Sequence, residues 1–529
     1  MSVETFEPDY VAERPRSRRE AWTDGARAFA QPRVMAMLFL GFSAGLPILL
    51  IFSTLGIWLR EAGIERATVT MFSWAALGYS FKFVWAPLVD RLPVPVLTRM
   101  FGRRRGWILA SQLTIAFAIA WMGLTDPALG GNALTVMALA AVLLGFSSAT
   151  QDVVIDAYRI EAADAKLQAL MSATYVAGYR IGMLVAGAGS LVLADVWGTG
   201  VGAYDHSAWQ GVYLAMAAVM GVGIATTLLI REPEVDRSSE GDGYTTRDYL
   251  GFLALFALAA AAFVAVFWLS AGDAKAAKDW LTALLANKAL AGILVEAARL
   301  GGAVLAAFLV ARALLATGTV NRTLVVSSYV APVREFFGRY TLGVALIFLA
   351  VVGLYRISDI VIGVISNVFY TDLGFSKSEI AGVVKTFGLL MTIAGGFIGG
   401  LVSLRFGVMR TLLWGAVLTV ATNLLFVLLA WTGPDPVMLY VVISADNLTA
   451  GLATAAFIAF LSALTDVRFT AVQYAIFSSM MTLLPKIIGG YSGTMVDAFG
   501  YETFFLIGSA LGVPVFALVW LAGRHLKLD

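Results

Sequence analysis

Three charged residues interrupt an apolar segment at a helical spacing, which is typical of a functional site inside a membrane protein. The stretch "GFSSATQDVVIDAYRIEAA", residues 145–163, continues the apolar run "LTVMALAAVLL" and carries Asp152, Asp156 and Arg159. On a helix these positions share one face. A charge near the centre of a bilayer costs at least about 2.5–3.5 kcal/mol, so it should face protein or a water-filled cavity. A structural ion pair is favoured for Arg159 and Glu161, whereas for Asp152 the sequence leaves open a structural role and a proton carrier, with Asp156 as its ionised partner.

Other charged residues also lie in apolar segments: Lys82, Arg180, Arg356, Asp359, Lys385, Asp446 and Lys486. Arg356 and Asp359 are three residues apart and can neutralise each other. The four remaining cations have no opposite charge within one turn of their own helix. They therefore indicate either an anionic guest or acidic partners on other helices, and the anionic guest is favoured. Asp359 and Asp446 are the further candidates for proton coupling.

Membrane-spanning helices must position these residues. The chain has 529 residues, 59% hydrophobic and 14% charged, against about 45–50% and about 25% in soluble domains. The apolar residues recur in blocks of roughly 20, which as helix cross about 30 Å of hydrocarbon. Backbone polar groups in lipid must be paired within the segment, so each block should be helical. The composition predicts an all-α polytopic membrane protein.

Apolar blocks between polar breaks predict fourteen transmembrane helices. Six are expected near 34–58, 67–88, 106–125, 133–156, 168–194 and 208–230. Two more are expected near 248–269 and 290–316, as an inserted hairpin. The last six are expected near 341–370, 378–403, 410–432, 437–464, 470–496 and 503–523.

The predicted helices divide the chain into five parts. They are a cytoplasmic tail (1–33), an N-terminal six-helix half (34–230), a linker with the two extra helices (231–340), a C-terminal six-helix half (341–523) and a cytoplasmic tail (524–529). Lys and Arg are concentrated in the loops on the N-terminal side, including the run Arg103–Arg105, which predicts cytoplasmic termini. Polar flanks suggest that the hairpin at 248–316 tolerates removal, and we assign it no transport role.

The two sets of six helices look related. "WLREAGIERATVTMF" follows the first helix and "FYTDLGFSKSEIAGV" follows the seventh, and each next helix carries one lysine, Lys82 or Lys385. Arg180 and Lys486 occupy similar places in their halves. Repeated halves are typical of secondary transporters, which place the substrate at the interface between halves.

Several function classes find no support in the sequence. The chain has no cysteine and two histidines, both outside the apolar blocks, so no thiolate or His/Cys metal site is expected. A net charge of +2 suggests no nucleic-acid partner. There is no GxSxG and no phosphate-binding Gly-rich loop. We expect a protein that is not an enzyme and that needs no cofactor.

The loop after the second helix points to a fold. "DRLPVPVLTRMFGRRRG", residues 90–106, resembles the major facilitator signature of Asp-Arg followed by Gly-Arg-Arg, with extra residues between its parts. A partial copy after the eighth helix keeps Gly400, Arg405, Gly407 and Arg410. With two six-helix halves, these motifs predict the major facilitator fold plus an inserted hairpin.

Stretches in both halves resemble the AmpG family of muropeptide permeases, a branch of the major facilitator superfamily. They include "LGFSAGLPILL", "FKFVWAPLVDR", "FGRRRGWILASQ", "SSATQDVVIDAYR", "GYRIGMLVAG", "LYRISD" and "VVKTFGLLMTIAGG", in order, across residues 33–523. "SADNLTAGLATAAF" and "LLPKIIGGYSG" match less well. The resemblance transfers functional positions to Lys82, Gln151, Asp152, Asp156, Arg180, Arg356, Asp359 and Lys385.

The resemblance implies import of GlcNAc-anhydromuramyl peptides across the bacterial inner membrane, driven by protons and serving cell-wall recycling. It also implies a link to β-lactamase induction, because the imported fragments signal to a regulator. Such substrates are carboxylate-rich, which suits a cation-lined cavity, and bear sugars, for which Tyr179 and Trp85 are candidate aromatic contacts. Lys486 joins the candidate substrate-binding cations. Two alternatives stay open: a related permease for another anion, such as an acyl-coenzyme A, and a non-transporting pigment-delivery or assembly factor.

Overall fold

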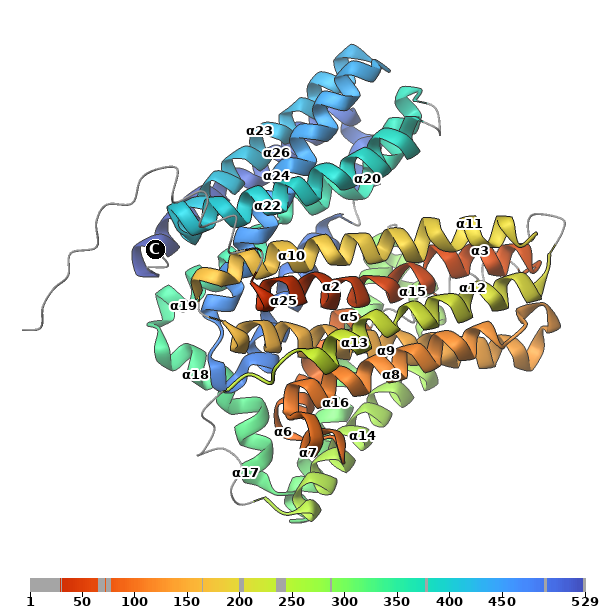
Figure 1. The fold of residues 1–529 in the computed structure, drawn as a ribbon, viewed down its shortest axis with the longest axis vertical. Coiled ribbons are helices and arrows are strands. Elements are labelled where there is room, and N and C mark those ends of the chain that lie inside the picture. Colours follow the sequence, from red (N-terminus) through yellow and green to blue (C-terminus); the bar gives the residue numbers. More distant parts are fainter. Residues whose placement is uncertain are drawn as a thin grey trace, which may run out of the picture.

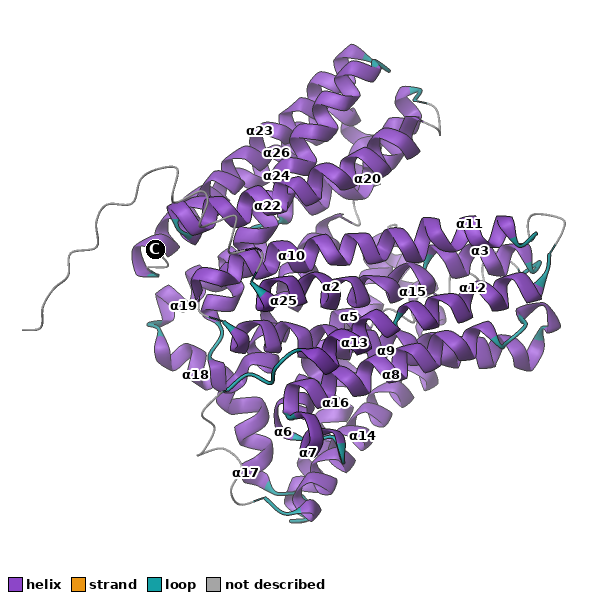
Figure 2. Ribbon diagram, in the orientation of Figure 1, coloured by secondary structure: helices purple, strands orange, loops and turns teal. Residues whose placement is uncertain are grey.

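The computed structural model describes residues 29, 31–64, 72, 78–163, 165–198, 204–234, 244–285, 288–375, 379–489 and 492–526. Within these residues the chain forms helices and connecting loops, without strands (Figure 2). Twelve of these helices are long and apolar enough to cross a membrane. The predicted all-α polytopic class is confirmed. The total of fourteen helices stays a prediction, because part of the segment 67–88 lies outside the described residues.

The N-terminal half contains five of the twelve candidate spans. Its elements are α2 (Pro32–Ile51), α3 (Ser53–Glu61), α5 (Gly78–Phe81), η2 (Lys82–Val84), α6 (Ala86–Arg91), α7 (Leu97–Phe101), α8 (Arg103–Gly123), η3 (Pro127–Leu129), α9 (Gly131–Ala162), α10 (Ala165–Leu184), η4 (Val185–Gly189), α11 (Ser190–Val196), α12 (His206–Val219) and α13 (Gly221–Leu229). Several predicted spans are broken: α2 and α3 are separated at Phe52, and a π-helical turn, η4, joins α10 to α11.

The C-terminal half repeats this pattern of long and broken helices. Its elements are α19 (Leu342–Leu354), α20 (Ile357–Leu373), η6 (Ile380–Phe387), α22 (Gly388–Phe406), α23 (Val408–Thr432), α24 (Pro436–Leu464), η7 (Val467–Phe469), α25 (Thr470–Gly489) and α26 (Ser492–His525). The last of these is bent at Gly500, whose φ of 78° is not helical. Positive φ costs glycine little because it has no Cβ.

The segment between the halves contains more helices than the two that the sequence predicts. The predicted pair of spans is present as α14 (Thr246–Leu269) and α16 (Lys288–Ala316), but α15 (Ala271–Leu285) lies between them. The polar stretch that follows folds into α17 (Arg322–Val325), η5 (Val326–Val330) and α18 (Ala331–Arg339). Tyr329 donates a hydrogen bond to the Val84 carbonyl (3.0 Å), and Gln473 donates one to the Pro332 carbonyl (2.8 Å). This connection therefore contacts both halves.

Glycines bring helices into backbone contact in each half. A Cβ added at Gly178 of α10 would lie 1.9 Å from the Leu38 carbonyl oxygen of α2, and one at Gly395 of α22 would lie 2.1 Å from the Leu448 carbonyl oxygen of α24. Both distances are far inside van der Waals contact. Close approach through small residues is the usual way in which membrane helices pack, because lipid provides no hydrophobic driving force. These glycines therefore allow α10 to approach α2 and α22 to approach α24.

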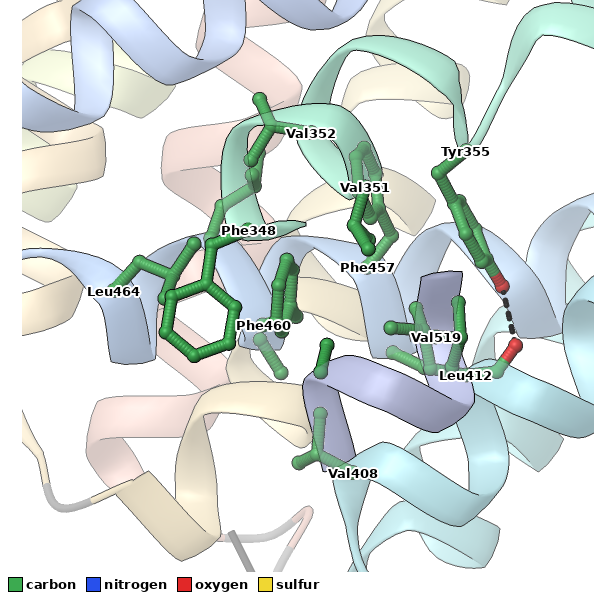
Figure 3. Close-up of a cluster of buried hydrophobic side chains, with 14 of the residues drawn as sticks. Phe348, Val351, Val352, Tyr355, Val408, Leu412, Phe457, Phe460, Leu464 and Val519 are labelled. Atoms are coloured by element: carbon green, nitrogen blue, oxygen red, sulfur yellow. Dashed lines mark hydrogen bonds between the residues drawn. The ribbon is translucent and has the colours of Figure 1, made fainter. Parts of the chain in front are cut away.

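Aromatic and aliphatic side chains fill the core of the C-terminal half. Figure 3 shows Phe348, Phe457 and Phe460 packed between α19, α23 and α24. The Tyr355 ring stacks on Phe457 with ring centroids 4.6 Å apart, and its hydroxyl donates to the Leu412 carbonyl (2.9 Å). A buried tyrosine needs such a partner for its hydroxyl. These contacts hold α19 against α23 and α24.

The two halves meet at one end of the molecule and diverge toward the other. Figure 1 shows α22 next to α10 near the C-terminus, and α24 also contacts α10; from there the C-terminal half, with α20, separates from α10 and α11. Contacts between α10 and α22, and between α9 and α25, join the halves. Gly400 of α22 permits this approach, since a Cβ there would lie 3.3 Å from the Ala173 Cβ.

Candidate functional site

A chain of buried charges links two elements of the N-terminal half. The Lys82 Nζ of η2 lies 3.8 Å from the Asp156 carboxylate of α9, and Asp156 also pairs with Arg159 at 3.3 Å. The Lys82 and Asp156 side chains are 10% and 12% exposed, and the Arg159 side chain is 0% exposed. Lys82 therefore has its acidic partner on another helix, which is one of the two alternatives that the sequence left open.

Asp152 lies one turn before Asp156 and is less tightly held. It accepts a hydrogen bond from the Tyr175 hydroxyl of α10 (3.2 Å) and lies close enough to Lys82 and Asp156 to interact electrostatically with both. A carboxylate with one hydroxyl donor keeps free lone pairs for a proton or a ligand. Asp152 is thus a partly buried acid with spare acceptor capacity, beside one cation and one second acid.

Arg159 is enclosed by polar groups from both halves. Its guanidinium donates to Gln168 (3.0 Å) and Ser172 (3.1 Å) of α10 and to Ser462 of α24 (2.7 Å). It also lies over the Tyr474 ring of α25, 5.2 Å from the centroid. Arg159 therefore binds the C-terminal half to the N-terminal half at the end where they meet.

The signature loop forms a second buried network at the same end. Arg104 donates to Asp90 (2.8 Å), to Glu161 (2.6 Å) and to Thr470 at the start of α25 (2.7 Å). Asp90 also accepts hydrogen bonds from the backbone amides of Ala471 (3.3 Å) and Val472 (3.0 Å). Anions are favoured at a helix N-terminus, where amides are unpaired. This network joins the halves, and Glu161 belongs to it rather than to an ion pair with Arg159.

The C-terminal half holds a pocket of about 180 Å³ between α20, η6, α23 and α24. The polar groups that line it are Asp359, Ser366, Tyr370, Asn423, Asp446 and Asn447. Asp359 accepts hydrogen bonds from Arg356, whose side chain is 27% exposed. Asp446 lies within electrostatic range of both, and within the described part of the chain it makes no hydrogen bond or ion pair.

Arg180 connects the two charged regions. It lies on α10, next to Tyr179, and interacts electrostatically with Arg356 and Asp359 across the interface between the halves. Among the residues that the structure describes, it forms no ion pair and donates no hydrogen bond. A mostly buried guanidinium without a carboxylate partner is costly unless a ligand supplies one.

The other residues predicted from the sequence are placed differently. Gln151 is fully buried and donates to Ser43 (2.7 Å), between α9 and α2. Trp85 donates to Thr150 (3.1 Å) and packs against Phe146, and it belongs to the apolar cluster that also holds Phe252 of α14. These two residues lie in packing interfaces. Tyr179 lies beside Tyr175, with ring centroids 6.2 Å apart.

The backbones of Lys385 and Lys486 lie in η6 and α25, and their side chains lie outside the described residues. Several residues that complete the site were not predicted: Tyr175, Tyr370, Asn423, Asn447 and Ser462. Each of these residues belongs to the site because folding places it beside a charged residue. An unaligned sequence does not show this, because neutral polar residues are common in membrane helices.

Comparison with known proteins assigns the family. A family model described as "Acetyl-coenzyme A transporter 1" matches residues 33–196. The "Anhydromuropeptide permease" of Escherichia coli K12 is 32% identical over 502 residues, covering 95% of this chain and 82% of the relative. The chain belongs to the AmpG family. A further member, "Putative transporter AmpG 4" of Rickettsia conorii, is 28% identical over 94% of this chain and 98% of its own length.

Solved structures show that this AmpG family member has the major facilitator fold. The proton:xylose symporter XylE matches 94% of this chain and 96% of its own, with a TM-score of 0.56 and 11% identity. The major facilitator transporter FucP, solved in an outward conformation, matches 94% of this chain and 99% of its own, with a TM-score of 0.56 and 12% identity. The fold and family predicted from the sequence are therefore confirmed, and the relatives are named as permeases or transporters.

Proposed function

We propose that this protein imports anhydromuropeptides, that is GlcNAc-anhydromuramyl peptides, across the bacterial inner membrane with protons. The observation that carries the proposal is the identity of 32% to the anhydromuropeptide permease of E. coli over 95% of this chain. Imported fragments would supply cell-wall recycling and thereby support β-lactamase induction. Both termini are cytoplasmic in this proposal, as the distribution of Lys and Arg in the loops predicts.

The state of the molecule follows from this orientation. The Arg104 and Arg159 networks join the halves at the end that carries the basic signature loop, which would be the cytoplasmic end. The diverging ends of α11 and α20 then face the periplasm (Figure 1). This is an outward-facing state, in which substrate and protons enter from outside.

Charge placement supports proton coupling through Asp152. Its carboxylate has spare acceptor capacity and lies beside Lys82 and Asp156. A proton on Asp152 removes one negative charge from this group, which leaves Lys82 with Asp156 as its single acidic partner. Release of that proton to the cytoplasm restores the second acid. Asp156, paired with Lys82 and Arg159, stays ionised and positions both cations.

Substrate carboxylates would bind at Arg180. This guanidinium lacks an ion-pair partner within the described residues and lies opposite Arg356. Two cations that face each other across the interface attract an anionic ligand between the halves. Lys385 and Lys486 belong to the same proposal as further cations of the two-half repeat, whereas Gln151 and Trp85 are left out because they are packed between helices.

Uptake into proteoliposomes tests the function. Radiolabelled anhydromuropeptide should accumulate when the interior is alkaline and equilibrate without accumulation when a protonophore is present. Acetyl-coenzyme A is the control substrate, because the family model that matches residues 33–196 bears that name. Accumulation of acetyl-coenzyme A instead of muropeptide, or uptake indifferent to the proton gradient, would contradict the proposal.

A further inference from the structure

The pocket in the C-terminal half is rich in hydrogen-bond acceptors. Two carboxylates, Asp359 and Asp446, and two amides, Asn423 and Asn447, line it together with two hydroxyl side chains. Among the described residues that line this pocket there is no lysine or arginine, and the lining Asp359 is paired with Arg356. A ligand group that donates hydrogen bonds suits these acceptors, and the charge of Asp446, which forms no ion pair with a described residue, disfavours a carboxylate beside it.

Several of these groups are free to bind. Asp446 makes no hydrogen bond within the described residues. Asn423 is 1% exposed and uses its amide nitrogen to donate to Ser358 (2.6 Å), while its carbonyl oxygen accepts nothing from the described residues. By contrast, Asn447 is engaged at both ends, donating to the Ile443 carbonyl and accepting from Thr392. The Asn423 carbonyl oxygen is therefore available to accept a hydrogen bond from a ligand or from water.

Apolar surface completes the pocket. Phe426 of α23 and the aliphatic side chains of Ile362, Val384 and Ile443 form its walls between the polar groups. Aliphatic and aromatic walls match the C–H faces of a ring, and the acceptors around them match hydroxyl groups at its edge. The volume of about 180 Å³ exceeds what a single ammonium group fills. A site that binds only an ammonium group would need the hydrogen-bond acceptors but not the apolar walls.

We propose that this pocket binds a neutral, hydroxyl-bearing sugar ring of the substrate. Asp446 and the Asn423 carbonyl oxygen accept hydrogen bonds from its hydroxyl or acetamido groups, and the Tyr370 hydroxyl offers a further contact. The inference rests on the proposed function and adds that two separate sites recognise two parts of the substrate. The cations at the interface take the anionic peptide, and the C-terminal half takes the sugar.

Binding to the purified full-length protein tests this division. The probes are the anhydrodisaccharide without peptide and the free stem peptide without sugar, each measured by calorimetry on detergent-solubilised protein. Asp446→Asn removes an acceptor and Tyr370→Phe removes a hydroxyl, each with little change of shape. Ser444→Ala is the matched control, since Ser444 lies on the same helix, is half-buried, does not line the pocket and donates to the Tyr440 carbonyl of that helix (2.6 Å).

Each pocket variant should lower affinity for the disaccharide by about five- to tenfold, the effect of one or more lost hydrogen bonds. Affinity for the peptide should stay within about twofold, and the control should behave as the parent. Equal losses for both probes, or no loss for the disaccharide, would overturn the inference. So would an Asp446→Asn variant that binds the disaccharide normally but no longer accumulates muropeptide, because Asp446 would then be a proton site.

The two proposals fail in different ways. A parent protein that binds the disaccharide but accumulates no muropeptide contradicts the proposed function, while the variants still decide where the sugar binds. A parent protein that transports muropeptide but whose disaccharide affinity is indifferent to Asp446 and Tyr370 contradicts only the sugar pocket.

Discussion

The two halves share a fold but hold their buried charges differently. In the N-terminal half, Asp156 is paired with both Lys82 and Arg159, and Arg104 with both Asp90 and Glu161. In the C-terminal half, the described ion pair at the site is Arg356 with Asp359, with side chains 27% and 25% exposed, and Asp446 forms no ion pair with a described residue.

This difference has a physical meaning. A fully enclosed charge must be paired and hydrogen-bonded, because its desolvation is otherwise too costly. In the N-terminal networks, Arg159 and Arg104 donate hydrogen bonds to Ser462 and Thr470 of the other half. These hydrogen bonds hold the two halves together. In the C-terminal pocket, by contrast, Asp446 and the Asn423 carbonyl oxygen have no partner among the described residues and are available to an occupant. In the proposed mechanism, the N-terminal half holds the two halves together and couples transport to protons, and the C-terminal half binds the sugar.

The largest effect is expected when a fully enclosed pair is broken. Arg159→Met should destabilise the protein by about 3–5 kcal/mol, because it leaves Asp156 with one partner and empties contacts to both halves. Arg356→Met should cost less, about 1 kcal/mol, since that pair is partly open to solvent. Thermal unfolding in detergent measures both. Equal costs would show that the halves do not differ in this way.

The glycine contacts are a feature that the halves share. Gly178→Ala and Gly395→Ala each place a methyl group on a neighbouring helix backbone, so each should destabilise by about 3 kcal/mol. Gly353→Ala is the control, because nothing lies within 4 Å of a Cβ added there. The melting temperature and the yield of folded protein report the outcome. If one of the two is tolerated, the close approach is not required in that half.

Substitutions of Asp152 and Asp446 test whether proton coupling and sugar recognition lie in different halves. Asp152→Asn cannot release or take up a proton, so it should abolish proton-driven accumulation and leave counterflow of substrate. Asp446→Asn should still accumulate substrate when its concentration is raised to offset weaker binding. Uptake and counterflow in the same proteoliposomes measure both properties. If the two variants exchange these behaviours, coupling lies in the C-terminal half.

Arg180 lies where the two regions meet. Arg180→Gln should weaken binding of the free stem peptide by about tenfold, the loss of one charge-assisted contact, and leave the melting temperature unchanged. Arg180→Lys, which keeps the charge, should recover part of the affinity. A large fall in stability would instead assign Arg180 to the structural networks.

The smallest effect is expected from the inserted helices. Removing residues 245–318 exposes Trp85 and its apolar neighbours, which pack on Phe252 of α14. Lipid is as apolar as the lost helices, so this exposure costs little. Uptake should stay measurable, while the connection from Val320 to Arg339, which contacts both halves, is kept. Complete loss of transport in a correctly inserted deletion would show that the hairpin belongs to the mechanism.

Much of this protein follows from the sequence alone. Apolar blocks of membrane length determine the helices, because lipid leaves the backbone no other partner. Spacing puts Asp152, Asp156 and Arg159 on one face of a helix, and it places Arg356 and Asp359 three residues apart, where they form the expected ion pair. Both rest on local geometry, which an unaligned sequence contains.

Tertiary structure decided which charges meet. Lys82 and Asp156 are 74 positions apart in the chain, and only the packing of η2 on α9 makes them a pair. Gln151, one position from Asp152, points instead into the contact with α2, because neighbouring residues on a helix face different directions. The pocket of Asp446 and Asn423 needs two helices side by side, and neutral side chains such as Asn423 carry no long-range signal in the sequence. Charge and periodicity are local properties, whereas a site is a property of helices brought together.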